Sequence, residues 1–154
     1  IGWNFHALPA GDLMPYTLEM IRHGATLTGA DYSLALRQAD MLHLQMAELF
    51  ERIDLLILPS TAATAWPHLD PPNEIGQKAT GPSLGGIQYG AIPFTMAFNI
   101  SWNPAASVPC GFDSLGLPIG LQVVGDLNDD STVLRACYAY EQATHWVDRR
   151  PPVS

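Results

Sequence analysis

The feature of this sequence that most constrains its fold is a pair of apolar runs at residues 105–109 and 119–124, joined by a connector at 111–118. Both runs contain β-branched residues, and Gly, Pro and Asp punctuate the connector, a pattern typical of two strands joined by a tight loop. Most positions of the runs are apolar rather than alternating, so we expect both faces of this hairpin to be buried in a larger sheet. The hairpin therefore predicts more surrounding protein than these 154 residues supply.

Three helices are predicted around this hairpin. The first runs from Asp12 to about Leu27, and the last is capped by Asp129 or Asp130 and continues through Trp146. The clearest is a helix of about 20 residues that Asp31 can cap, because apolar residues recur every three or four positions along it. Its apolar stripe consists of Tyr32, Ala35, Ala39, Leu42, Met46, Leu49 and Ile53.

A further strand is predicted at residues 54–58, where a short apolar run ends at Pro59. Helices alternating with strands predict an α/β sandwich, with no domain boundary inside residues 1–154. Periodicity disappears over residues 60–90, where Pro and Gly recur, and long loops of this kind often line functional sites. The chain begins with Ile1 rather than Met, so either the true N-terminus was removed or the chain is a piece of a longer protein. We expect a single domain that is incomplete, because a sheet that ends here would leave an unpaired strand edge.

An ordered set of motifs resembles the C-terminal portion of the amidase signature family. The set extends back to residues 54–59 and forward to a closing helix near Glu141; its members are Asn99, Pro104-Ala105, Ser107-Val108-Pro109, Gly111, Gly116-Leu117-Pro118, Gly120-Leu121-Gln122 and Gly125. Members of this family hydrolyse carboxamides with a Ser–cis-Ser–Lys triad. The resemblance implies the C-terminal part of an α/β fold in which α-helices sandwich a mixed β-sheet, and it implies neither a metal nor a cofactor.

The catalytic half of the family's pattern has no counterpart in this chain. In the family, the nucleophile lies in a Ser/Gly-rich block, and backbone groups beside it form the oxyanion hole. No such block is present here, and the only lysine, Lys78, has no paired serines around it. No residue of the chain therefore inherits a catalytic role. We expect the chain alone to be inactive and to depend on an N-terminal catalytic segment or on a second chain.

What the resemblance does imply is one wall of the acyl pocket, at Thr95, Phe98 and Trp102. The family often has Gly where Trp102 stands, so this indole either narrows a pocket for a small-molecule amide, stacks on an aromatic substrate, or is a core aromatic. Glutamine-directed relatives tend to have an acidic residue at the position of Ile92. An apolar residue there argues against an amino-acid amide as substrate.

Composition excludes several classes of partner. A net charge of −8 with only seven Lys and Arg argues against nucleic acid, because phosphate contacts need clustered cations. No apolar run approaches the roughly 20 residues that span a bilayer. Cys110 and Cys137 are predicted to be reduced thiols, which favours the cytoplasm. The five histidines are scattered and form no metal-binding motif.

Two other functions remain open. A chain that retains only this half of the fold can serve assembly or ligand binding without catalysis, and an unpaired strand edge predicts self-association as a homo-oligomer. Alternatively, residues 81–85 read Gly-Pro-Ser-Leu-Gly and match the G-x-S-x-G elbow of serine hydrolases, with Ser83 as nucleophile. That elbow requires a buried strand before the serine and a helix after it, whereas residues 74–80 are polar and Gly85-Gly86 is a poor helix start.

Overall fold

The structure is a computed structural model that describes residues 13, 15–67, 74–75, 78–79, 83–84, 87–88, 92–146 and 149. The chain divides into two compact units. One unit comprises residues 1–37 and 66–91, and the other comprises residues 38–65 and 92–154. Helix α2 (Gly29–Phe50) begins in the first unit and ends in the second.

The first unit contains helix α1 (Pro15–Gly24) and the beginning of α2. The predicted helix start at Asp12 lies outside the described residues. The cap of α2 is Thr28 rather than Asp31, which corrects the sequence prediction. The Thr28 N–H donates to Asp31 Oδ2 (2.8 Å) and the Asp31 N–H donates to Thr28 Oγ1 (3.2 Å), the reciprocal arrangement of a capping box.

Two antiparallel hairpins of two-residue strands lie where the sequence shows no periodicity. Strand β2 (Glu74–Ile75) pairs with β3 (Lys78–Ala79), and β4 (Ser83–Leu84) pairs with β5 (Ile87–Gln88). Such short strands carry too few side chains to produce a detectable alternation.

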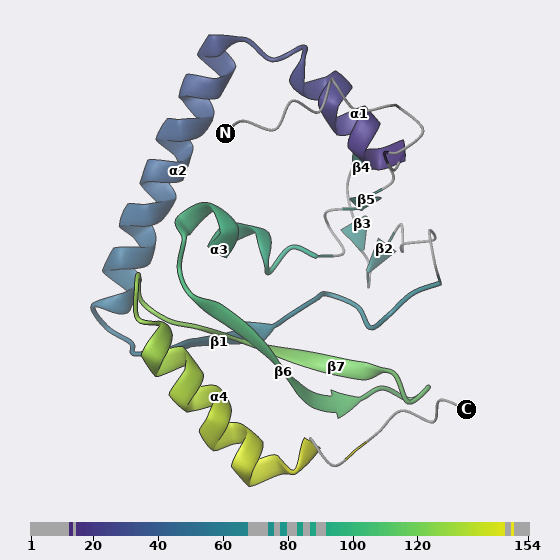
Figure 1. Ribbon diagram of the computed structural model, residues 1–154, viewed down its shortest axis with the longest axis vertical. Helices are drawn as coiled ribbons and strands as arrows, with labels where there is room; N and C mark the ends of the chain where they lie inside the picture. Colours follow the sequence, from purple (N-terminus) through teal and green to yellow (C-terminus); the bar gives the residue numbers. More distant parts are fainter. Residues whose placement is uncertain are drawn as a thin grey trace. The chain divides into compact units, whose positions relative to one another are not determined.

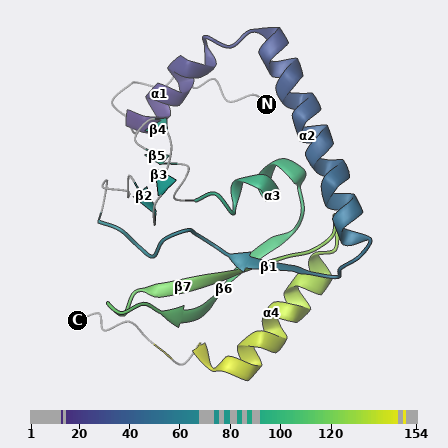
Figure 2. The same ribbon diagram turned by 180° about the vertical axis from the view of Figure 1, so that it is seen from behind.

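The second unit is built on a three-stranded antiparallel sheet (Figure 1 and Figure 2). Its order is β1 (Leu56–Pro59), β7 (Pro118–Val124), β6 (Ala105–Phe112), so β7 is central. The predicted hairpin is confirmed, although β6 continues past a register shift between Pro109 and Gly111. Pro59 lies within β1 rather than after it, and a strand at the edge of the described sheet tolerates the missing N–H.

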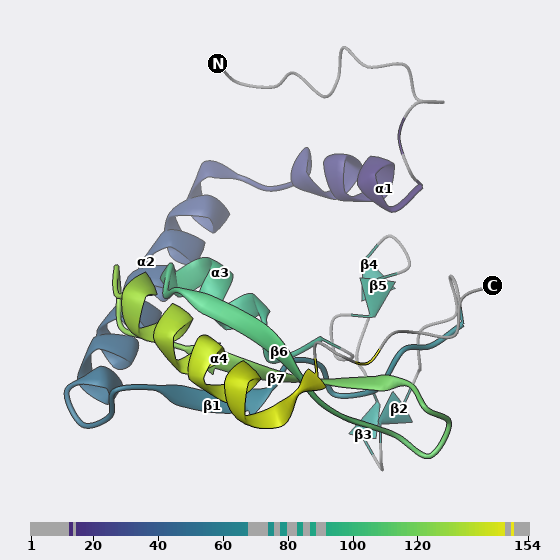
Figure 3. The ribbon, with the colours of Figure 1, turned by 60° about the horizontal axis from the view of Figure 1, so that its bottom comes forward.

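Helices cover both faces of this sheet. Phe50 at the end of α2 and Phe98 in α3 (Met96–Ser101) pack with Val124 to form the core, surrounded by Met46, Ile53, Leu56 and Leu58. Helix α4 (Asp130–Thr144) packs on β6 and β7 (Figure 3). Asp129 caps α4 by accepting a hydrogen bond from the Thr132 N–H, as predicted. The expected α/β sandwich is thus confirmed.

Burial differs between the two strands of the hairpin. Residues 122–125 around the end of β7 are buried, whereas side chains along β6 alternate between half-buried and exposed. Val108, expected in a dry core, is only half-buried. The reason is topological: β7 has neighbours on both sides, while β6 forms an edge of the described sheet. Across the described residues, no helix combines the length and the apolarity needed to cross a bilayer.

Candidate functional site: residues 92–104

The predicted acyl-pocket residues lie on one segment, residues 92–104, which enters and leaves α3. Its beginning is fixed by the central strand, because Gln122 Nε2 donates to the Phe94 carbonyl at 2.7 Å. Thr95 lies in the turn before α3, where its hydroxyl donates to the Ile92 carbonyl at 3.3 Å. The first predicted wall residue, Thr95, therefore uses its hydroxyl to close a local turn.

Helix α3 is tied to the rest of the second unit from two sides. Phe98 is 7% exposed and packs against Phe50 and Val124 in the core. On the other side, the Nε2–H of His43 donates to the Ile100 carbonyl at 2.8 Å. This bond satisfies one of the carbonyls that a helix end leaves without an internal partner. Phe98 thus supports the segment from the core.

Trp102 follows α3 in the left-handed conformation, with φ 59° and ψ 20°. A side chain other than glycine pays about 1–2 kcal/mol in this region because Cβ crowds the following carbonyl oxygen. Trp102 is 75% exposed, and among the described residues its ring contacts the His43 ring, 5.8 Å away between centroids and tilted by 54°. The strained residue therefore presents its large aromatic surface outward.

The residues on either side of Trp102 are buried. Asn103 Nδ2 donates to the Gly125 carbonyl at 2.9 Å, and the Gly125 N–H donates to the Pro104 carbonyl at 3.0 Å. Ser101 Oγ and Asn103 Oδ1 are buried, and neither finds a hydrogen-bond partner among the described residues. Buried polar atoms are nearly always paired. These two buried polar atoms, one on each side of Trp102, are exceptions to that rule among the described residues.

A second polar feature lies on the same face of the sheet as Gln122 and was not detected from the sequence. Ser60 directly follows β1 and Ser107 lies in β6, and their Oγ atoms share a hydrogen bond of 2.5 Å across Gly120 in the central strand. A Cβ at Gly120 would lie 2.7 Å from Ser60 Oγ and 2.9 Å from Ser107 Oγ. Glycine is therefore required here by the close approach of the two hydroxyls.

The hairpin turn is organised by Asp113. Its Oδ1 accepts hydrogen bonds from the Leu115 and Leu117 N–H groups, both at 2.9 Å, and its Oδ2 accepts one from Thr64 Oγ1 at 2.8 Å. These bonds, chiefly that from Leu117, hold the pKa of the Asp113 carboxyl below its ordinary value. Gly116 completes the turn with φ 78°, which glycine adopts without a steric penalty. Asp113 thus joins the turn to the loop after β1.

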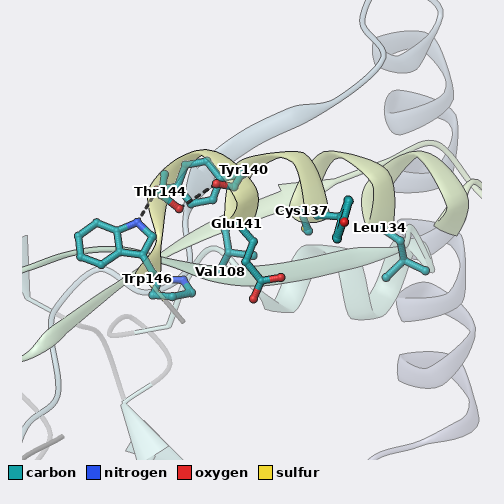
Figure 4. Close-up of a pocket in the computed structure, with 9 residues that line it drawn as sticks. Val108, Leu134, Cys137, Tyr140, Glu141, Thr144 and Trp146 are labelled. Atoms are coloured by element: carbon teal, nitrogen blue, oxygen red, sulfur yellow. Dashed lines mark hydrogen bonds between the residues drawn. The ribbon is translucent and has the colours of Figure 1, made fainter. Parts of the chain in front are cut away.

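The opposite face of the sheet carries a pocket between α4 and β6, of about 360 Å³ (Figure 4). Val108 and Pro109 form its strand side, and Leu134, Cys137 and Glu141 line its helix side. Trp146 closes one end. Burial raises the pKa of the Cys137 thiol, so this cysteine is a poor nucleophile. The pocket shares no residue with the predicted wall at Thr95, Phe98 and Trp102.

The remaining candidate groups do not form a reactive centre in the part of the chain that can be described. No three His, Cys, Asp or Glu side chains gather there closely enough to hold a metal ion. Ser83 stands in β4, directly before the return strand β5, and not at a strand-to-helix turn. The residues before it and its side-chain partners lie outside the described residues. Cys110 and Cys137 are both free thiols.

Comparison with known proteins identifies the family. The Amidase family model matches residues 2–134. The chain is 36% identical over 122 residues to the A-subunit of glutamyl-tRNA(Gln) amidotransferase from Thermosynechococcus vestitus, a match that covers 79% of this chain and 23% of that protein. The corresponding protein of Oceanobacillus iheyensis is 34% identical over 122 residues, with the same coverage. The chain thus spans about a quarter of the length of these relatives.

Comparison with solved structures leads to the same family. The fold is similar to a 6-aminohexanoate cyclic dimer hydrolase, with a TM-score of 0.72 and 28% identity, over 94% of this chain and 31% of that one. It is also similar to a bacterial aryl acylamidase of the amidase signature family, with a TM-score of 0.73 and 25% identity, over 97% and 31%. The motifs around the hairpin, the sandwich built on it and these matches agree, and the chain belongs to the amidase signature family.

Proposed function

We propose that this chain is part of an enzyme that hydrolyses a carboxamide C–N bond through a serine nucleophile located outside these 154 residues. Membership of the amidase family supports the reaction class. The names of two structural neighbours, an aryl acylamidase and a cyclic dimer hydrolase, support hydrolysis rather than another use of the fold. The chain contributes core strands and the segment at residues 92–104 that forms part of the acyl-pocket wall.

The observation that supports this role is that Trp102 combines a strained backbone with an exposed ring. Its backbone is strained and its ring is exposed, although hydrogen bonds fix the segment on both sides of it. Strain of this kind persists where the surrounding structure holds it in place, and it concentrates at binding and catalytic sites. An outward indole contributes little to the chain's own core. Its large apolar face is suited to a substrate acyl group, with Thr95 and Phe98 supporting the same wall.

The substrate we propose is a small-molecule amide with an apolar or aromatic acyl group. Ile92, half-buried at the start of the segment, offers no charge to an amino group. This distinguishes the proposal from the substrate named for the curated relatives, glutamyl-tRNA(Gln). We propose the cytoplasm as the compartment, because both cysteines are free thiols.

The test uses the complete enzyme and a series of amides that differ only in the size of the acyl group. Trp102→Gly should raise kcat/KM for bulky acyl groups relative to small ones by about tenfold, since a few buried atoms in a pocket are worth about 1–3 kcal/mol. Trp66→Gly replaces a second exposed tryptophan and should leave the ratio unchanged. An equal loss across the whole series in Trp102→Gly would remove the segment from the substrate site.

The location of the nucleophile has its own experiment. The 154-residue chain should show no turnover on simple amides, and activity should appear when a catalytic segment with the Ser/Gly-rich block is added as a separate polypeptide. Turnover by the short chain alone, with its intact mass verified, would contradict the proposal. Labelling of Ser83 by a fluorophosphonate, abolished in Ser83→Ala, would favour the serine-hydrolase alternative instead. Persistent inactivity with stable binding of the added segment would favour the assembly role.

A further inference from the structure

We propose that the pocket between α4 and β6 binds a small aromatic amine, with its ring between Val108 and Trp146 and its ammonium group at the Glu141 carboxylate. This site goes beyond the proposed amidase function and does not depend on it, because none of its residues lies on the segment at 92–104. Its volume of about 360 Å³ falls in the range of small-molecule sites, about 300–1,000 Å³.

The helix side of the pocket follows from the spacing of its residues. Leu134, Cys137, Tyr138 and Glu141 are three, four and seven positions apart from the first, so they share one face of α4. In Figure 4 the side chains of Leu134, Cys137 and Glu141 lie in this order along the helix, with Val108 of β6 facing them. The helix thus provides an apolar surface with one carboxylate at its end.

The end of the pocket is preorganised by interactions around Trp146. Trp146 Nε1 donates to Tyr140 Oη at 3.3 Å, and the Thr144 hydroxyl donates to the Tyr140 carbonyl at 2.8 Å. The Phe112 ring lies 5.7 Å from the Trp146 ring, and the Arg149 guanidinium lies 4.9 Å from its centroid. The indole is therefore held in place as a wall. A binding surface that is already ordered avoids part of the entropy cost of binding.

The charge of the pocket selects the ligand class. Among the described residues that line it, Glu141 is the one that carries a full charge, and that charge is negative. Arg149, the basic residue at the Trp146 end, is stacked on the rings of Phe112 and Trp146. An amine gains attraction at Glu141, whereas a carboxylate ligand is repelled. Aromatic rings additionally favour tilted packing on Trp146.

The experiment titrates the complete enzyme with three indoles of matched size: tryptamine, its neutral analogue tryptophol and the anion indole-3-acetate. Backbone amide shifts measured by NMR should be confined to Val108 and residues 134–146. Tryptamine should bind most tightly and indole-3-acetate most weakly. Glu141→Gln should weaken tryptamine binding by about two- to fivefold, as expected for an ion pair at an exposed carboxylate, and leave tryptophol binding unchanged. Glu51→Gln removes an exposed acid of the same type elsewhere and should change neither.

A second readout uses the two thiols. Tryptamine should slow alkylation of Cys137 by iodoacetamide and leave Cys110, which does not line the pocket, unaffected. Absence of shifts at the pocket residues with all three probes would overturn the site. Equal affinity for tryptamine and tryptophol, or an unchanged preference in Glu141→Gln, would overturn the assignment to an amine. Because these measurements require no turnover, their failure is distinguishable from failure of the amidase proposal.

Discussion

Replacing Trp102 by glycine should leave the stability of the chain nearly unchanged, which is unusual for the loss of a tryptophan. Trp102 is 75% exposed, so about a quarter of its surface is covered. For a side chain of about 200 Å² this is about 50 Å², worth about 1.2 kcal/mol at about 25 cal/mol per Å². The tilted contact with His43 adds about 0.5 kcal/mol. Glycine removes the strain of the left-handed backbone, which adds about 1–2 kcal/mol back to the free energy of unfolding.

Urea unfolding of Trp102→Gly and Trp102→Ala separates these two contributions. Both variants lose the ring, but alanine retains the backbone strain and glycine does not. We expect Trp102→Gly to lie within about 1 kcal/mol of the parent chain, and Trp102→Ala to be less stable than Trp102→Gly by about 1 kcal/mol once the freedom of unfolded glycine is included. Losses of about 3–5 kcal/mol in both variants would show that the indole is a core residue and refute this reasoning.

Three further changes test the sheet and its turn. Val123→Asp places an unpaired charge at the buried end of β7 and should lower the free energy of unfolding by about 3 kcal/mol or more, measured by urea unfolding. Val108→Asp, on the half-buried strand β6, should lower it clearly less, and equal losses would contradict the difference in burial. Gly120→Ala should lower the free energy of unfolding by about 1–3 kcal/mol, because the added methyl group overpacks the site, and adding Ser60→Gly should restore part of this stability. An unchanged stability in the single variant would show that the Ser60 and Ser107 hydroxyls move aside at little cost. Asp113 should stabilise the fold above its unfolded pKa of about 3.9, and this contribution should be lost as the pH falls through its lower folded pKa. Asp113→Asn should therefore weaken the fall in the urea midpoint below about pH 4, and an unchanged pH profile would exclude Asp113 as a source of that fall.

Local patterns in the sequence were sufficient for the elements that depend on neighbouring residues. The turn signals after residue 110 identified the hairpin, and an acidic residue before an apolar periodicity identified the cap of α4. The cap of α2 was misplaced by three residues, because Asp31 was considered alone. The pattern Thr28-x-x-Asp31 carries the capping-box signal, and reading both residues together would have placed the cap correctly.

Features that join distant segments were not predictable in the same way. The Ser60–Ser107 bond spans 47 residues and the Thr64–Asp113 bond spans 49. Each depends on the register of β7 against a strand from elsewhere in the chain, which no periodicity specifies. The exposure of the Trp102 ring also depends on how distant segments pack. Its sequence position allowed a core aromatic as readily as a pocket residue, and only the tertiary placement of α3 shows the ring to be exposed.

The register of β7 determines where both candidate sites lie. Gln122 and Val124 face the side of α3, where Gln122 holds the Phe94 carbonyl and Val124 packs on Phe98. Val123 pairs with Ala106 of β6, whose neighbour on the same face, Val108, lines the α4 pocket. A slip of one residue would exchange the two faces, move Gln122 away from residues 92–104 and bury it against α4. Gly120, which admits the Ser60–Ser107 bridge at one position of β7 only, opposes that slip. The close packing at this glycine therefore helps to fix the position of Trp102 as well as the local geometry of the sheet.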